Sequence, residues 1–204
     1  MKLIRNLILF TLVLSLYFTS FGQVSHSVNF SQESKQFSSI IGEDDVQYQR
    51  IVFDQTHSTQ EVGNPELPEK YIKLIVPSNQ DVESITINNL EQKNVSGDYF
   101  IYPTQYPVPM QDDHKPPFVK PNSVVYSSDD FYPVNCVKFV RDGYFDGSNH
   151  IVIIAVYPYQ YKPKSRELIF NYSIEFTLNM KSGKSKSIQV RMRDEKIKKF
   201  MIRY

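Results

Sequence analysis

The stretch IVIIAVYPYQYKP, residues 151–163, indicates the expected fold most directly. Six consecutive apolar residues without alternation are typical of a buried strand in the middle of a sheet. The two prolines and three tyrosines that follow predict that this strand ends abruptly and that the chain turns back. Another strand-like stretch then begins at Glu167.

Similar short segments recur along the chain, rich in Val, Ile, Tyr and Phe and separated by clusters of Pro, Gly, Asn and Asp. They are residues 49–53, 71–76, 82–87, 98–102, 134–140, 151–157 and 168–178. This spacing predicts an all-β fold, an antiparallel β-sandwich-like single domain or a related barrel. Alternating apolar residues at 84–87 and 172–178 predict strands with one wet face, whereas residues 151–156 should be covered on both faces. No amphipathic helix of three turns is expected in the body of the domain.

Residues 1–22 have the features of a secretory signal peptide. Lys2 and Arg5 precede an apolar stretch at residues 7–18, and small Ser20 and Gly22 occupy the cleavage positions. The competing interpretation, a membrane helix, would need roughly 20 apolar residues. We therefore expect cleavage after Gly22, a secreted, periplasmic or cell-surface location, and no membrane span in the mature chain.

The residues that most often carry catalysis or bind metals are scattered. The single Cys136 lies in a short apolar run, which favours a buried thiol over a nucleophile. The histidines lack the spacing of a zinc site and are expected on the surface; they are His26, His57, His114 and His150. Acidic pairs at 44–45, 112–113 and 129–130 could touch calcium but fit turns better. We expect no metal, no cofactor and no catalytic site.

Two segments stand apart from the expected sheets. Residues 103–121 contain six prolines, too many for a paired inner strand, and should form a projecting loop with polyproline character. Residues 181–204 carry a net charge of +7, against −6 for residues 1–180. A basic linker or truncated connection to a further domain is favoured over an arm for an acidic partner or a nucleic acid. The β domain should therefore span residues 23–180.

Five elements in a fixed order resemble the N-terminal propeptide of the gingipain-like (C25) cysteine proteases. They are GNPELP at 63–68 with VPS at 76–78, IYP at 101–103, FYP at 131–133, Arg141 with Gly143, and the run at 151–163. Lys162 stands where the family usually has Asn. The resemblance extends from about Gly63 to Leu178, more than half of the expected mature chain.

The resemblance implies a propeptide that acts as an intramolecular chaperone and active-site inhibitor of a cognate cysteine protease until proteolysis removes it. In the family, an arginine in the loop after IYP can enter the specificity pocket. The equivalent position here is Met110, between Pro109 and Gln111, and the nearest basic residues are Lys115 and Lys120. The family's catalytic His and Cys have no counterpart, so the chain should not be an enzyme. Lys199 and Arg203 are candidate maturation cleavage sites.

An alternative function is a secreted β-sandwich module that binds glycans or a surface partner through its many tyrosines. Exposed aromatic side chains in a shallow groove would favour that module, whereas a projecting loop at residues 103–121 would favour the propeptide. A structural part of an outer-membrane secretion apparatus is a third, weaker interpretation.

Overall fold

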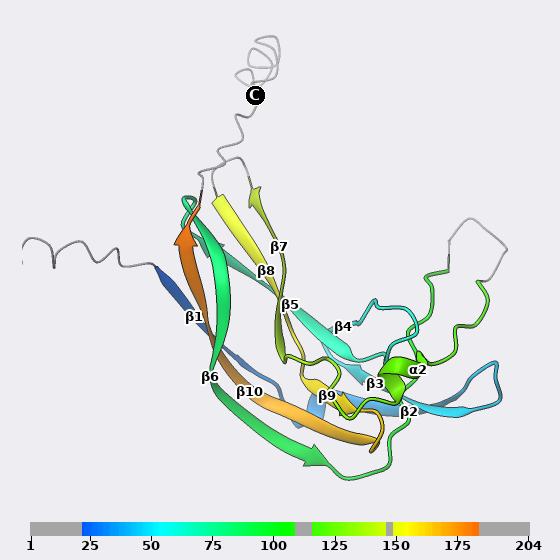
Figure 1. The fold of residues 1–204 in the computed structure, drawn as a ribbon. Coiled ribbons are helices and arrows are strands. Elements are labelled where there is room, and N and C mark those ends of the chain that lie inside the picture. The colour runs from blue at the N-terminus through cyan, green and yellow to red at the C-terminus, as the bar shows by residue number, and fades with distance from the viewer. Residues whose placement is uncertain (1–21, 109–115, 146–148, 184–204) are drawn as a thin grey trace, which may run out of the picture.

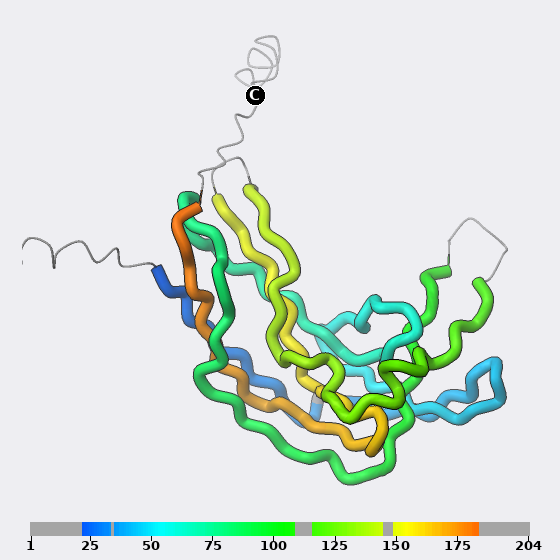
Figure 2. The backbone as a smooth tube through the Cα atoms, in the orientation of Figure 1, coloured from blue at the N-terminus to red at the C-terminus, as the bar shows by residue number. Residues whose placement is uncertain are grey.

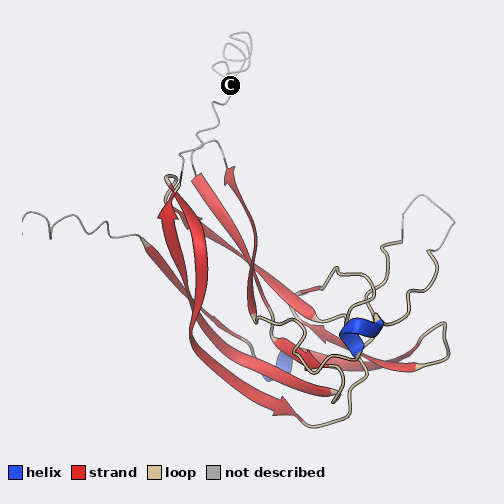
Figure 3. Cartoon of the chain, viewed as in Figure 1, coloured by secondary structure: helices blue, strands red, loops and turns tan. Residues whose placement is uncertain are grey.

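The computed structural model describes residues 22–108, 116–145 and 149–183. These residues form mainly antiparallel β-strands, with one short helix, α2 (Ser123–Tyr126), and one 3-10 turn, η1 (Gln32–Ser34). Figure 3 shows how completely strands dominate the chain. The predicted all-β, sandwich-like fold is confirmed.

The strands form two four-stranded sheets and a separate hairpin (Figure 1). In the first sheet, β10 (Glu167–Ser182) lies between β1 (Gln23–Asn29) and β6 (Gln80–Val95), and its first four residues pair with β9 (Tyr159–Lys162). The second sheet has the order β4 (His57–Ser58), β5 (Pro68–Val76), β8 (Asn149–Val156) and β7 (Val137–Phe145). The hairpin joins β2 (Lys35–Ile41) to β3 (Gln47–Phe53).

Strand β8, which contains the apolar run, lies centrally in the second sheet between β5 and β7, as predicted. Covering on both faces holds only for its last three residues, 154–156, which are all fully buried. Ile151 and Ile153 point to the outer face and are only half-buried. The prediction of complete covering was therefore wrong for the first half of the strand, where Ile151 and Ile153 line an open surface pocket with Lys73 and Arg141.

The turn after β8 carries the chain from one sheet to the other. Val156 ends β8 in the second sheet, and Tyr159 begins β9, which pairs with β10 of the first sheet. Asn171, fully buried on β10, holds this turn: its backbone N–H donates to the Pro158 carbonyl at 2.8 Å, and its Nδ2 donates to the Tyr157 carbonyl at 3.0 Å. The predicted abrupt strand end is thus a crossing between sheets.

The long strands β6 and β10 bend where their pairing register shifts. Shifts lie at Asn171/Ser173, Glu175/Phe176 and Asn179/Met180, and such bulges increase bending and twist. Figure 1 shows both strands curving together around the core. On β10, Ile174, Phe176 and Leu178 are fully buried while Glu175 is exposed, as predicted. Tyr172 is nevertheless exposed and Thr177 is buried, so the predicted alternation holds only in part.

The sequence pattern missed four strands and placed one wrongly. Strands β1, β2, β4 and β9 were not predicted, because their mixed polar residues or short length gave no clear period. Residues 98–102 were expected to form a strand but make only an isolated bridge, Gln49 to Ile101. The other six predicted segments lie in strands, with different ends.

Single residues test the remaining expectations. Cys136 is buried, and burial raises the pKa of its thiol, which fits a structural role. His150 is fully buried, so its predicted surface position was wrong; His26 is half-buried, His57 is exposed and His114 lies outside the described residues. No helix in the described ranges is long and apolar enough to cross a membrane.

Removing a buried side chain from β8 should destabilise the domain far more than removing an exposed one from the neighbouring strand. Ile154 has no exposed surface, whereas Ile75 on β5 is 71% exposed. Ile154→Ala should cost about 3 kcal/mol of unfolding free energy through the lost burial and the cavity left behind. Ile75→Ala should cost less than about 1 kcal/mol. Urea unfolding followed by circular dichroism measures both, and equal losses would contradict this assignment of the core.

Candidate functional site

The described parts of the proline-rich segment form two arms that leave the body of the domain side by side (Figure 2). Residues 103–108 make one arm and residues 116–121 the other. The Gln105 side chain joins them: its Nε2 donates to the Val119 carbonyl at 2.9 Å, and its Oε1 accepts from the Val119 N–H at 2.8 Å. The side-chain amide thus replaces a strand partner where proline prevents regular pairing.

The GNPELP phrase fastens both arms to the domain. The Gly63 N–H donates to the Thr104 carbonyl at 2.9 Å, and the Thr104 N–H donates to the Asn64 carbonyl at 2.8 Å. On the second arm, the Asn122 N–H donates to the Gly63 carbonyl at 2.8 Å. Gly63 has φ +83°, a conformation that side chains rarely adopt, so glycine is needed for the turn that meets both arms.

Aromatic packing supports the base of the arms from below. Tyr102 packs edge-on against the buried Tyr48, with ring centroids 5.6 Å apart, and Phe118 of the second arm lies 6.0 Å from Tyr102. The Arg50 guanidinium lies 4.8 Å from the centre of the Tyr102 ring and 3.0 Å from the Glu66 carboxylate. Strand β3 and the GNPELP phrase therefore hold one ring at the root of the arms.

The FYP motif and the tyrosines after β8 meet at the same end of the sandwich, whereas VPS at 76–78 and Gly143 lie at the other end, next to the start of β8. Tyr132 of FYP forms a two-way backbone bridge with Tyr161, both bonds 2.7 Å long. The hydroxyl of Tyr161 donates to the Tyr99 carbonyl at 2.7 Å, and that of Tyr126 on α2 donates to the Ile101 carbonyl at 2.7 Å. Phrases separated by up to about a hundred residues in sequence thus build one support for the arms.

These hydroxyls lie in a poorly solvated environment. Burial raises the pKa of Tyr161 to about 12. The pKa values of Tyr126 and Tyr132 are raised further, mainly by burial and in addition by nearby tyrosines and acidic residues. The phenols therefore stay neutral and keep donating their hydrogen bonds across the physiological pH range.

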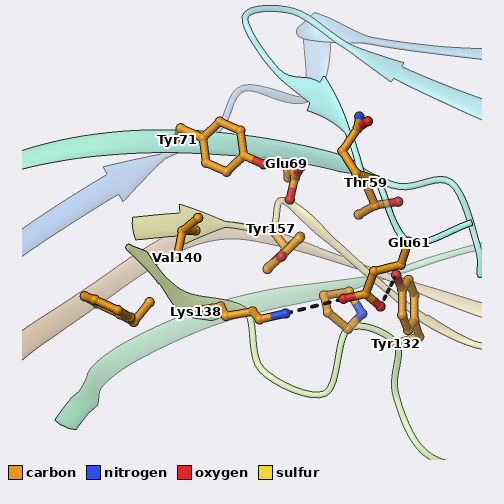
Figure 4. Close-up of a pocket in the computed structure, with 11 residues that line it drawn as sticks. Thr59, Glu61, Glu69, Tyr71, Tyr132, Lys138, Val140 and Tyr157 are labelled. Carbon is orange, nitrogen blue, oxygen red and sulfur yellow. Dashed lines mark hydrogen bonds and ion pairs between the residues drawn. The ribbon is translucent and has the colours of Figure 1, made fainter. Parts of the chain in front are cut away.

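A pocket of about 250 Å³ lies beside this support, between β5 and β7 (Figure 4). Lys138 reaches across it to Glu61, with Nζ 3.4 Å from Oε1, and the Tyr132 hydroxyl donates to the same carboxylate at 3.2 Å. Partial burial of Glu61 acts to raise the pKa of its carboxyl group. Hydrogen bonds from Asn64 and Tyr132 and the charge of Lys138 act in the opposite direction, and the net effect is a lowered pKa.

The inner wall of the pocket is formed by the carboxylate of Glu69 and the phenol groups of Tyr71 and Tyr157. Glu69 is buried and accepts a 2.6 Å hydrogen bond from the Tyr71 hydroxyl, whose pKa is raised to about 12 by burial and by this carboxylate. Tyr157 is buried behind them. Since Glu61 also binds Asn64 of the GNPELP phrase at 3.0 Å, the pocket is linked directly to the root of the arms.

Of the residues predicted for the inhibitory loop, only Lys120 lies in the part of the chain that the structure describes. Pro109, Met110, Gln111 and Lys115 lie outside the described residues, as do Lys199 and Arg203. Lys120 is exposed, but it lies at the root of the second arm, between Val119, whose backbone is tied to Gln105 of the first arm, and Asn122, whose backbone is tied to Gly63. Sequence reasoning missed Gln105 and Asn122, because single polar residues among prolines do not reveal which backbone groups they meet.

The family model Propeptide_C25 matches residues 16–200. The chain belongs to the C25 propeptide family. The earlier resemblance is thereby confirmed over almost the whole chain, and the match is to the propeptide, not to the catalytic protease domain. No curated protein sequence gives a significant match.

Two solved structures of Porphyromonas gingivalis proteins share the fold of this C25 propeptide. One concerns the zymogenic latency of gingipain K, with a TM-score of 0.65, 21% identity, and coverage of 81% of this chain and 90% of that one. The other is a complex of the RgpB pro- and mature domains, with a TM-score of 0.68, 16% identity, and coverage of 87% and 89%. At these identities the likeness establishes the fold.

Loss of the bridge between the arms should expose the loop without unfolding the domain. Gln105→Ala removes both hydrogen bonds to Val119, so cleavage within residues 103–121 by proteinase K should speed up several-fold while the melting temperature changes little. Gln60→Ala is the matched control, because Gln60 is exposed and donates only to the nearby Ser58 carbonyl. Mass spectrometry locates the cuts. Identical cleavage of both variants would contradict the bridging role.

Alkaline pH should destabilise the propeptide through its buried tyrosines. Above pH 10 the unfolded chain loses phenolic protons that the native state retains, so stability falls by about 1.4 kcal/mol per pH unit for each such tyrosine. The contribution of Tyr161 is complete below pH 10 and is lost as the pH rises through about 12. Absorbance at 295 nm should show late ionisation of part of the 14 tyrosines. Ionisation of all of them near pH 10 in the folded protein would refute this.

Proposed function

We propose that this C25 propeptide binds the catalytic domain of a cognate gingipain-like cysteine protease, assists its folding and keeps it inactive until proteolysis. Family membership supplies the partner class. The fold is shared with a structure that concerns zymogenic latency of gingipain K, and with one in which the RgpB pro-domain is in complex with the mature domain. Both support latency through direct binding of the protease.

The observation that carries the proposal is the pair of anchored arms. An inhibitory segment that is free to move loses conformational entropy when it docks, and this loss weakens binding. Here proline restricts the chain, the GNPELP phrase fixes both roots, and Gln105 fixes the spacing between the arms. A segment carried in this way loses less entropy on entering a cleft than an untied loop does.

The arms also indicate which predicted residues are best placed to reach a partner. Exposure rises along the first arm from the buried Thr104 to Tyr106 and Val108, which are 53% and 62% exposed. The contact with the cleft is therefore assigned to Pro109, Met110 and Gln111, with Lys115 as the basic alternative. Lys120 is the weaker candidate, because Val119 before it is bonded to the other arm and Asn122 after it is bonded to Gly63.

The flanking segments fit the same function. Gingipain-family proteins are secreted, and residues 1–22 would provide the export signal for this chain. Residues 23–180 would then form the inhibitory domain, and residues 181–204 the basic connection, with Lys199 and Arg203 as sites at which a trypsin-like enzyme releases it.

One aromatic pocket that the alternative, a glycan-binding module, could use is the pocket of Figure 4. Two of its four aromatic side chains, Tyr132 and Tyr157, are largely covered, and only Tyr71 and Phe139 are exposed, by 39% and 40%. The pocket also holds the Glu61–Lys138 ion pair. These features suit a pocket that supports the arms better than a shallow aromatic groove, so the propeptide function is preferred.

Inhibition measurements with a changed loop residue test the proposal. The wild-type chain should inhibit the C25 protease of its own organism. Met110→Arg should weaken that inhibition at least tenfold and strengthen inhibition of an arginine-directed C25 protease by a similar factor, because the side chain at this position would enter the specificity pocket. Inhibition constants from a fluorogenic peptide substrate measure both effects.

Ile75→Arg is the matched control, since it places the same side chain on an exposed site near the far end of β5. It should leave both inhibition constants unchanged. If Met110→Arg alters neither constant, the assignment of the loop to the cleft is wrong. Absence of inhibition by the wild-type chain itself would overturn the proposed function.

A further inference from the structure

The end of the sandwich away from the arms contains a compact group of potential metal ligands. Asp81, Asp142 and His150 each offer a ligand atom within 4.8 Å of the other two. Within residues 22–108, 116–145 and 149–183, they form the one group of three or more His, Cys, Asp or Glu side chains that meets this spacing. His150 Nε2 is 2.9 Å from Asp142 Oδ2.

Strand pairing brings the three residues together from both sheets. Tyr144 on β7 pairs with His150 on β8, which places Asp142, two residues earlier on β7, diagonally across from the histidine. Asp81 is the second residue of β6 in the other sheet. Figure 1 shows the start of β6, the start of β8 and the end of β7 gathered at this end of the molecule. An ion held here would connect the two sheets.

The state of His150 points independently to a ligand. Its side chain is fully buried, yet Nδ1 has no hydrogen-bond partner in the structure. When Nε2–H donates to Asp142, Nδ1 keeps a lone pair that no hydrogen-bond donor in the described chain uses, and this lone pair is available to a metal ion. The Tyr144 ring stacks on the imidazole, with centroids 4.7 Å apart and planes 6° apart, and the Tyr144 hydroxyl is tied to the Ser78 carbonyl at 2.7 Å. The ring is therefore held in one orientation toward the two carboxylates.

The donor set selects the kind of ion. One imidazole nitrogen and two carboxylate oxygens are ligands that Zn²⁺ commonly takes, with bond lengths of about 2.0–2.2 Å. Calcium and magnesium prefer oxygen ligands alone. Tetrahedral geometry at those bond lengths needs ligand atoms about 3.4 Å apart, so small side-chain rotations suffice to close the group.

The backbone at Gly183 leaves room for the third ligand. A Cβ atom at this position would lie only 2.7 Å from the Asp81 carboxylate, and the Gly183 N–H donates to the Asn79 carbonyl at 2.8 Å. The end of the first sheet is thus folded closely against Asp81. An ion on this carboxylate would fasten the point at which the chain leaves the sandwich.

We propose that Asp81, Asp142 and His150 form a zinc site that fastens β6 to the β7–β8 hairpin. The site is separate from the proposed contact with the protease and is measured on the chain alone. Its effect is to brace the end of the sandwich from which residue 184 and those after it continue.

Zinc titration of the untagged chain tests the site. After treatment with a chelator and its removal, calorimetry with ZnCl₂ should show one ion bound per chain with micromolar or tighter affinity, and the melting temperature should rise with zinc concentration. Cobalt should give the visible absorption of a tetrahedral ion. Asp81→Asn and Asp142→Asn should each weaken zinc binding at least tenfold. Glu83→Gln, at an exposed carboxylate on the same strand, is the matched control and should bind zinc as the wild-type chain does.

Three results would overturn the proposal. They are the absence of zinc binding by the folded wild-type chain, unchanged binding by Asp81→Asn, and equal affinity for calcium and zinc. Circular dichroism of each variant confirms that it is folded, and the two carboxylate variants avoid truncation of the buried His150 ring.

Discussion

The crossing of the chain between sheets at Tyr157 and Pro158 is the constraint on which the rest of the structure depends. Strand β8 completes the centre of the second sheet, and β9 begins at once on the first. The fully buried Asn171 satisfies both carbonyls of the turn, Pro158 through its backbone N–H and Tyr157 through its side-chain Nδ2, and its Oδ1 accepts from Gln92 at 2.7 Å. A polar group this deeply buried is tolerated only when its hydrogen bonds are made, so the turn, β6 and β10 must assemble together. The same crossing places Tyr161 where it can bridge to Tyr132 beneath the arms.

Several of the sequence motifs that carry the family resemblance share one structural role in this arrangement. GNPELP supplies the backbone groups that fasten the proline-rich arms, IYP begins the first arm, and FYP and the tyrosines after β8 form the support below. Glycine and proline at these points set backbone conformations that other residues adopt poorly. An inhibitor of this kind gains from rigidity, because entropy removed during folding is not lost again on binding.

The two ends of the sandwich are specialised differently. At one end, buried phenols and paired amides hold the arms, together with the ion pairs Arg50–Glu66 and Lys138–Glu61. At the other end, Asp81, Asp142 and His150 concentrate ionisable groups from both sheets. Strands β5 and β8 run between these ends, so the same apolar core supports both.

The sequence alone determined the all-β class, the central place of residues 151–156 and the proline-rich segment outside the sheets, because each follows from local composition and period. It also carried the family resemblance, which rests on short phrases of fixed order. Only the tertiary structure decided that residues 98–102 form no strand, that His150 is buried, and that Gln105 and Gly63 hold the arms. These outcomes depend on partners far away in sequence: Val119 meets Gln105, and Asp81 approaches His150, only after the two sheets have packed. Local patterns report the propensity of a segment, whereas long-range packing determines which polar groups meet.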